Sequence, residues 1–285
     1  MRVAAFVSDL HTGSAVAPWP RSDEATGADE LPRLGKGPRF TIARYLTDCW
    51  YHMVEEYIPS IVESVGGKLD LLAVVGDCID GKQRKSQSTG LVTADMGDQA
   101  RASSALLQPL AKQFKRIIRV HGTAYHDGFE DELGRLDRDC GVARVRQMFD
   151  LHLSDTCKIN LAHHPMGGGA MYKGTVLDRE LLWVKRRAAE GKLDMPDVLV
   201  RSHLHEYAQL EQEDMQMFIT PCWQMPNAWA VKTGWAKWQP TLGILMAFED
   251  IDTPEPLRHA TGWRFHHHTY PIPRVPVQTV RLQDL

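Results

Sequence analysis

Apolar positions follow two different spacings along this chain. Short segments rich in apolar and β-branched residues predict strands buried inside a sheet, at 3–7, 71–75, 116–120, 157–162 and 198–200. Longer segments repeat apolar residues at helical spacing, at 40–65 (with Pro59 predicting a break or a new start), 99–114, 129–139 and 175–191. Further strand-like pieces lie at 149–153, 207–210, 215–220, 242–248 and 263–270. The alternation predicts an α/β fold whose last third is mostly strand.

Residues 14–38 interrupt this pattern. They are rich in Pro, Gly, Asp and Glu and show no periodicity, which predicts a long surface loop inserted into the domain. We expect residues 1–270 to form a single domain. The proline-rich residues 271–276 predict that 271–285 is an extended tail lying on the surface.

Composition narrows the class of protein. With 43% hydrophobic and 24% charged residues, the 285-residue chain can bury a proper core. Its net charge of −3 provides no global basic field for nucleic acid. No apolar stretch is long enough for a secretory signal or a membrane span, and the five cysteines include no CxxC pair. We therefore expect a soluble cytoplasmic protein with free thiols and no membrane partner. The oligomeric state stays open.

Side chains that bind metals or transfer protons follow five of the predicted strands. They are Asp9 and His11, Asp77 and Asp80, His126, His163 and His164, and His203 and His205. Any one group could occur by chance or serve only as a hydrogen-bonded strand end. Five in succession predict a common site at one end of one sheet, where parallel strands present ligands. Mixed carboxylate and imidazole ligands suit Mn, Fe, Zn or Ni better than Mg or Ca. A desolvated carboxylate needs a neutralising charge, so we expect Asp77 to bridge two metal ions.

Over roughly residues 3–221 these groups resemble the calcineurin-like metallophosphoesterases. That family carries the blocks D-x-H, G-D-x-x-D, G-N-H-[DE], H and G-H-x-H in this order. The first block matches residues 9–11, the second matches 76–80, and the last matches 202–205 with serine in place of glycine. The isolated middle histidine corresponds to His163, with His164 as the alternative. The resemblance implies a four-layer α/β fold, in which a central β-sandwich of mixed sheets is flanked by helices.

The resemblance also implies roles for these positions and two divalent metal ions as cofactors, with Mn favoured and Fe, Zn or Ni as alternatives. The ligands of the first ion would be Asp9, His11, Asp77 and His205. Those of the second ion would be Asp77, His163 and His203. A metal-bridging hydroxide would attack phosphorus, and His126 would act on the leaving oxygen as the catalytic histidine, oriented by Asp127.

The third block departs from the family pattern. The chain reads G-T-A-Y-H-D at 122–127, so it lacks the Asn and adds two residues. Either Thr123 or a water would take the place of the Asn ligand on the second metal ion. The favoured function is hydrolysis of phosphate mono- or diesters, with the substrate left open and including nucleotides or nucleic acid. A DNA end-processing nuclease of the same superfamily and a catalytically silent binding or scaffold protein remain alternatives.

Two further groups bear on substrate selection. A basic run after the second block either binds additional phosphates or forms a solvated loop, which we favour: Lys82, Arg84 and Lys85. Four indoles after the last block either stack on bases or pack under an irregular loop, which we also favour: Trp223, Trp229, Trp235 and Trp238.

Overall fold

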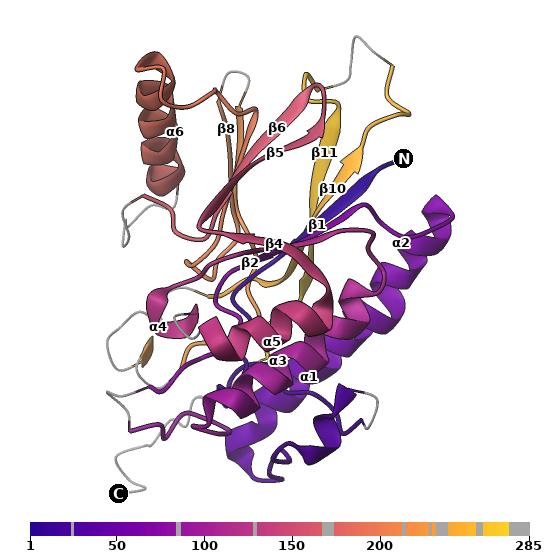
Figure 1. Ribbon diagram of the computed structural model, residues 1–285, viewed down its shortest axis with the longest axis vertical. Helices are drawn as coiled ribbons and strands as arrows, with labels where there is room; N and C mark the ends of the chain where they lie inside the picture. The colour runs from indigo at the N-terminus through magenta and orange to yellow at the C-terminus, as the bar shows by residue number, and fades with distance from the viewer. Residues whose placement is uncertain are drawn as a thin grey trace, which may run out of the picture.

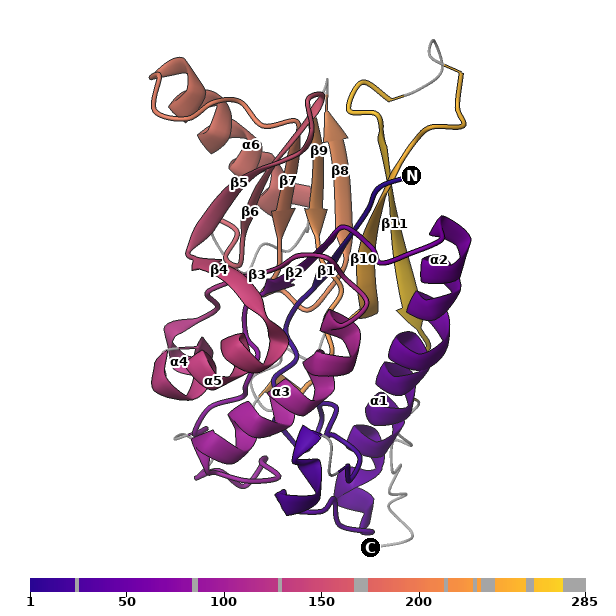
Figure 2. The ribbon, with the colours of Figure 1, turned by 45° about the vertical axis from the view of Figure 1, so that its right-hand side comes forward.

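Two β-sheets pack face to face in the protein, and helices cover the outer face of each sheet (Figures 1 and 2). The computed structural model describes residues 1–23, 26–83, 87–127, 130–166, 174–212, 215–227, 230–231, 239–254 and 259–273. Among these residues, none of the helices combines the length and the apolar character needed to cross a bilayer. The predicted four-layer α/β architecture with a central sandwich of mixed sheets is confirmed.

The first sheet contains the N-terminal strand at its centre. Its strand order is β11-β10-β1-β2-β3-β4, where β1 to β4 are parallel neighbours and β10 and β11 are antiparallel additions. The bounds are β1 (Val3–Val7), β2 (Leu71–Val75), β3 (Ile117–Val120), β4 (Val142–Arg146), β10 (Leu242–Glu249) and β11 (Trp263–Tyr270).

The second sheet is built from the middle of the chain. Its strand order is β5-β6-β7-β9-β8, with β6, β7 and β9 parallel and the two edge strands antiparallel. The bounds are β5 (Met148–Ser154), β6 (Cys157–Ala162), β7 (Val198–Arg201), β8 (Ala208–Gln212) and β9 (Met215–Ile219).

Helices form the two outer layers. One face of the first sheet is covered by α1 (Thr41–His52), the π-helical turn η4 (Met53–Tyr57), α2 (Ile58–Val65), α3 (Met96–Ala111) and α5 (Glu130–Cys140). The far face of the second sheet is covered by α6 (Gly174–Ala189), seen at the upper left of Figure 2. Three shorter pieces are η2 (Ala28–Glu30), η3 (Pro38–Phe40) and α4 (Ala124–Asp127).

The strands of the first sheet divide their side chains between two cores, as the two-residue period of a strand requires. In β1, Ala5 faces the helical layer, whereas Ala4 and Phe6 face the second sheet. In β2, Val74 faces the helical layer and Ala73 faces the second sheet. Burial on both faces explains why these strands read as continuous apolar runs in the sequence.

The structure differs from the sequence reading in two elements. Strand β4 was not predicted, since it is an edge strand whose mostly exposed residues leave no apolar run. The segment 14–38 is not only a surface loop, because the Trp19 indole is 2% exposed and packs with Leu31 and with Ala105 of α3. The predicted tail 271–285 lies outside the described residues from 274 onward.

Candidate metal centre

The predicted ligands follow strands of both sheets. β1, β2 and β3 belong to the first sheet, but β6 and β7 belong to the second, so the prediction of five strand ends in one sheet was wrong. The two sheets are joined at this edge by hydrogen bonds that main-chain amides donate to Asp9. The Trp223 amide donates to the Asp9 carbonyl (3.0 Å), and the His203 amide donates to Asp9 Oδ2 (3.2 Å). The site is therefore shared between the sheets of the sandwich.

The backbone at this edge adopts an uncommon conformation. Positive φ angles between 46° and 73° occur at five of the predicted ligands, which are Asp9, His11, Asp77, His203 and His205. A left-handed residue directly after a strand turns the chain sharply. Non-glycine residues in this region are uncommon and cluster at functional sites, where the surrounding structure holds them.

A first cluster is formed by Asp9, His11 and His205, whose ligand atoms lie within 4.8 Å of one another. The Nε2 atoms of His11 and His205 are 3.0 Å apart, and His205 Nε2 is 3.4 Å from Asp9 Oδ1. Asp9 and His11 are buried. Two imidazole nitrogens that face one carboxylate oxygen at this spacing can converge on a single cation.

A second cluster surrounds one oxygen of Asp77. Its Oδ2 atom lies 3.1 Å from His163 Nε2 and 3.9 Å from His203 Nδ1. His163 Nδ1 faces the Val75 carbonyl at 2.8 Å, and because a carbonyl can only accept, Nδ1 carries the proton. This hydrogen bond leaves the Nε2 lone pair of a neutral His163 directed at the site.

Asp77 connects the two clusters. The same Oδ2 atom that contacts His163 is 3.7 Å from His11 Nε2 of the first cluster. Asp77 is 1% exposed, and the Thr123 amide holds its other oxygen, Oδ1, at 2.6 Å. One carboxylate oxygen thus stands between imidazoles of both clusters, as a bridging ligand requires.

The donor atoms fit divalent cations. Asp9 Oδ1 and His163 Nε2 are buried atoms for which the described residues provide no hydrogen bond of good geometry. The nearest polar atoms given for them are other predicted ligands, His205 Nε2 at 3.4 Å from Asp9 Oδ1 and Asp77 Oδ2 at 3.1 Å from His163 Nε2. Buried carboxylates and imidazoles that face one another in this way suit a bound divalent cation.

The electrostatics of the site keep the carboxylates of Asp9 and Asp77 ionised. Burial alone would raise the pKa of Asp77, but the neighbouring His163 and His203 hold that pKa well below its ordinary value. Burial likewise opposes ionisation of Asp9, yet His205 lowers the pKa of Asp9. For His163, burial acts downward and the charge of Asp77 acts upward, and the result is a pKa raised to about 9. Both carboxylates are therefore ionised at neutral pH and provide negative charge to a cation.

The structure places His126 beside the first cluster but not in contact with Asp127 as predicted. His126 Nδ1 donates to the Asp80 carbonyl (2.8 Å), and its ring meets the His11 ring edge-on at 4.5 Å. The Asp127 carboxylate instead accepts from the amides of Cys78 (3.1 Å) and Gly122 (2.7 Å). Successive residues of α4 point about 100° apart, since a helix has 3.6 residues per turn. The prediction that Asp127 orients His126 was wrong, and Asp127 instead fixes the loops around Asp77.

Thr123 lies next to the Asp77 carboxylate, and its place as a ligand of the second ion stays a prediction. Its hydroxyl donates to Asp77 Oδ2 (3.1 Å) and lies 3.5 Å from His203 Nδ1. The residue before it must be glycine, because a Cβ at Gly122 would lie 2.2 Å from Asp77 Oδ1. Thr123 therefore holds the carboxylate in place through its amide and its hydroxyl.

Sequence reasoning named Asp80 without giving it a role, and it gave none to Ser202. The Asp80 carboxylate lies 3.2 Å from His11 Nδ1 and accepts from Gln224 (2.8 Å), so Asp80 orients a ligand. Ser202 Oγ lies 2.7 Å from His163 Nδ1. Both positions stand inside the matched blocks, and this proximity was the available signal.

The substrate-selecting groups are only partly described. Lys82 is exposed, whereas Arg84 and Lys85 lie outside the described residues, as do Trp229, Trp235 and Trp238. Trp223 is fully buried and packs edge-to-face on Trp50, with ring centroids 4.9 Å apart. Trp223 is therefore a core residue and does not present its ring to a base.

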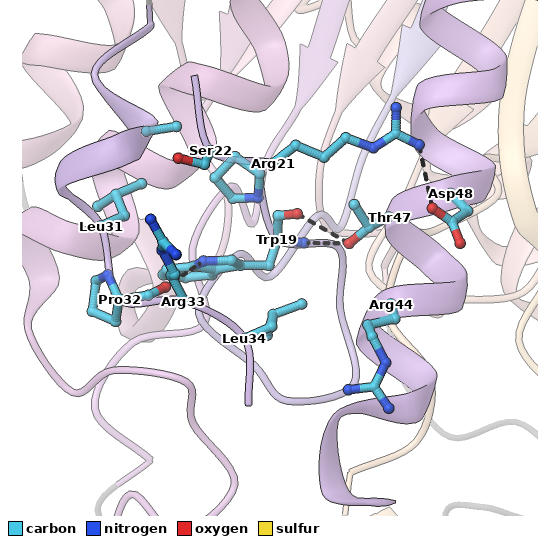
Figure 3. A pocket seen from close by; sticks show the side chains of 12 residues that line it. Trp19, Arg21, Ser22, Leu31, Pro32, Arg33, Leu34, Arg44, Thr47 and Asp48 are labelled. Atoms are coloured by element: carbon cyan, nitrogen blue, oxygen red, sulfur yellow. Dashed lines mark hydrogen bonds and ion pairs between the residues drawn. The ribbon is translucent and has the colours of Figure 1, made fainter. Parts of the chain in front are cut away.

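A separate pocket of about 430 Å³ lies between the segment 14–38 and α1 (Figure 3). Its lining includes Trp19, Arg21, Arg33 and Arg44, and none of the predicted metal ligands. Arg21 pairs with Asp48 across its rim. The pocket beside the segment 14–38 is thus distinct from the metal centre.

No family model and no curated protein matches this chain. Similar solved structures include wild-type Vps29 complexed with Zn²⁺ from Entamoeba histolytica, with a TM-score of 0.41, 9% identity, and coverage of 94% of this chain and 98% of that one. A novel archaeal phosphodiesterase has a TM-score of 0.41, 12% identity, and coverage of 93% and 99%. A predicted phosphoesterase from Streptococcus pneumoniae has a TM-score of 0.35, 12% identity, and coverage of 94% and 98%.

Proposed function

We propose that this chain is a phosphoesterase that depends on two divalent metal ions and hydrolyses phosphate mono- or diesters. One observation carries the proposal: Asp77 Oδ2 lies between His11 Nε2 (3.7 Å) and His163 Nε2 (3.1 Å), which belong to different clusters. A carboxylate oxygen shared by two imidazole-rich clusters is the arrangement that a pair of adjacent cations needs.

The ions would be held by the residues already described. Asp9, His11, His205 and Asp77 would bind the first ion, and Asp77, His163 and His203 would bind the second. Two divalent ions in this place would supply the positive charge that activates water and neutralises a phosphate ester. Mn²⁺, Fe²⁺, Zn²⁺ and Ni²⁺ all suit such mixed ligands.

The remaining residues of the site would orient the ligands and transfer a proton. Asp80 orients His11 through its carboxylate and holds His126 through its carbonyl. Because Nδ1 of His126 is occupied in this way, Nε2 is the atom through which His126 would transfer a proton to the leaving oxygen. His126 is half-buried beside the first cluster and is accessible to an ester bound there.

The test compares the wild-type protein with Asp77→Asn. We expect the wild type to bind two equivalents of Mn²⁺ or Zn²⁺ and to hydrolyse p-nitrophenyl phosphate or its bis-ester. Asp77→Asn should lose at least one ion and reduce turnover by on the order of 10²-fold or more. Asp155→Asn is a matched control, because Asp155 is an exposed residue in the β5–β6 turn.

Three results would contradict the proposal or redirect it. Wild-type turnover in Asp77→Asn would refute the bridging role of Asp77. Cleavage of single-stranded DNA, with neither nitrophenyl ester hydrolysed, would indicate the nuclease. Two bound ions with no turnover of any of these substrates would indicate a binding protein.

A further inference from the structure

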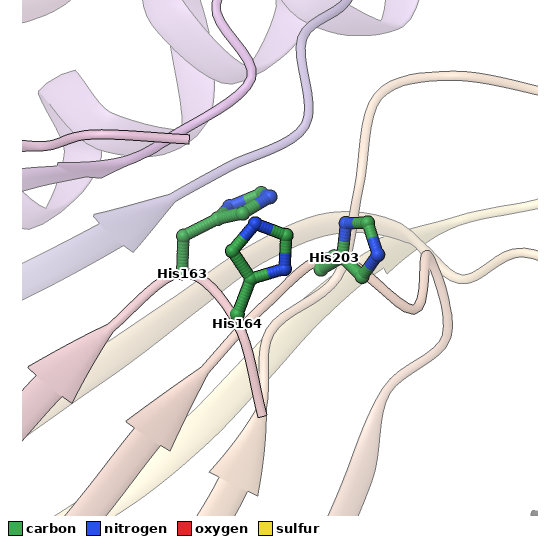
Figure 4. A group of neighbouring side chains, drawn as sticks. All are labelled: His163, His164 and His203. Carbon is green, nitrogen blue, oxygen red and sulfur yellow. The ribbon is translucent and has the colours of Figure 1, made fainter. Parts of the chain in front are cut away.

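The second cluster contains one more imidazole than its proposed ligand set uses. His163, His164 and His203 offer ring nitrogens that all lie within 4.8 Å of one another, and Figure 4 shows the three rings facing a common space. The ring centroids of His164 and His203 are 4.4 Å apart, and those of His163 and His164 are 4.8 Å apart. His164 follows His163 directly after β6.

We propose that His164 binds the second metal ion together with His163 and His203, so that this ion has three imidazole ligands besides Asp77. The inference rests on the proposed two-ion site and adds to it a ligand and a metal preference.

The first argument compares two possible ligands on this side of the cluster, Thr123 and His164. Thr123 is the neighbouring polar residue, but its hydroxyl proton is directed at Asp77 Oδ2 (3.1 Å). A neutral hydroxyl is a weak ligand for a divalent transition metal, whereas a neutral imidazole is a strong one. An exposed imidazole next to His203 is the stronger donor within reach.

The second argument is that a ligand position is already prepared. His163 is 1% exposed, its Nδ1 is fixed by the Val75 carbonyl at 2.8 Å, and its Nε2 faces Asp77 Oδ2 at 3.1 Å. A cation that displaces the Nε2 proton would lie between this nitrogen and the Asp77 oxygen, next to the other two rings.

The third argument concerns distance. Nitrogens at about 2.1 Å from a tetrahedral zinc ion lie about 3.4 Å apart. The three rings must therefore close by no more than about 1.4 Å from a 4.8 Å separation. His164 is exposed, so its ring can turn without displacing core residues.

The chemical consequence is a preference among metals. Three imidazoles and one carboxylate form a ligand set that favours Zn²⁺ over Mn²⁺ more strongly than a set with a hydroxyl or water in place of His164. Removal of His164 should therefore weaken Zn²⁺ binding more than Mn²⁺ binding.

The experiment titrates metal-free wild type, His164→Ala and His152→Ala with Zn²⁺ and with Mn²⁺ against a chromophoric chelator. His152 is an exposed histidine of β5 and serves as the matched control. In His164→Ala we expect the Kd of one of the two Zn²⁺ ions to rise at least tenfold, on the order of the effect of losing a ligand or its partner, with a smaller change for Mn²⁺. The visible spectrum of bound Co²⁺ should change in the same variant and stay unchanged in His152→Ala.

Failure of this inference differs from failure of the proposed function. If the wild type binds two Zn²⁺ ions and His164→Ala binds both within twofold of wild type with the same Co²⁺ spectrum, His164 is not a ligand. Loss of turnover in that variant with both affinities intact would assign His164 to proton transfer and also overturn the inference. If the wild type binds fewer than two ions, the two-ion function itself is wrong.

Discussion

Replacement of Gly76 by alanine tests how closely the two sheets must approach to build the site. Gly76 has φ +79°, and a Cβ there would lie 2.4 Å from His163 Nδ1 and 2.6 Å from the Gly122 Cα. Two separate costs follow. A left-handed conformation costs an L-residue about 1–2 kcal/mol. Forcing an extra carbon into a packed site costs about 1–3 kcal/mol more.

Gly141→Ala separates these two costs. Gly141 lies between α5 and β4, has φ +67°, and a Cβ there would meet nothing within 4 Å. Gly141→Ala should therefore lower the free energy of unfolding by only the conformational cost, about 1–2 kcal/mol. Gly76→Ala should lower it by about 2–5 kcal/mol, the sum of the two costs.

The assay is urea denaturation of the metal-free proteins followed by circular dichroism, because bound metal would add its own stabilisation. Zinc stoichiometry is then measured for both variants. We expect Gly76→Ala to lose an ion, since His163 must move away from Asp77, and Gly141→Ala to keep both. Equal loss of stability in the two variants, with both retaining two ions, would show that the approach of His163 to β2 is not tight.

Two further predictions concern groups outside the metal centre. Glu180 of α6 pairs with Arg201 of β7 at 2.9 Å, and both are at most 2% exposed, so Glu180→Ala should lower the free energy of unfolding by about 3–5 kcal/mol by leaving a buried charge unpaired. Glu190→Ala, at an exposed residue directly after the same helix, should change it far less, and similar urea midpoints for the two variants would contradict the role of the pair. Burial raises the pKa of Cys157 to about 12, so its thiol stays protonated in the fold. Its stabilising contribution is complete below the unfolded thiol pKa of about 8.5 and is lost as pH rises toward 12. All five cysteines are buried, so Ellman's reagent at pH 8 should label them only after denaturation, and rapid labelling of the folded protein would refute this.

The sequence predicted most of the elements because burial leaves a periodic trace. β1 and β2 read as apolar runs since both of their faces are covered, and the helices on the first sheet carry one apolar face. No periodic pattern in the sequence indicates which of the two sheets a strand joins. β3 and β6 have similar local patterns, yet they pair in different sheets, because pairing depends on contacts between distant segments.

In the site too, features with a local sequence pattern could be predicted and features that depend on distant contacts could not. The clustering of the candidate ligands could be predicted because each follows a strand, and strand ends gather functional side chains. The role of Asp127 could not, because adjacency to His126 in sequence does not place two side chains on one face of α4. The supporting contacts of Asp80 depend on a main-chain carbonyl and on Gln224, which is 144 positions away. No local pattern reveals such contacts.

The left-handed ligand positions are the strongest sign that this edge of the sandwich serves chemistry. Folding alone would favour glycine wherever φ is positive, as at Gly76, because glycine adopts this conformation without steric cost. At Asp77 and His203 the chain instead carries side chains whose left-handed backbone costs on the order of 1 kcal/mol each. Together with Asp9, His11 and His205, such costs come to about 5 kcal/mol, the lower end of the about 5–15 kcal/mol by which a whole domain is stable. Packing alone does not require buried carboxylates and imidazoles at these positions, whereas the proposed cations would require them.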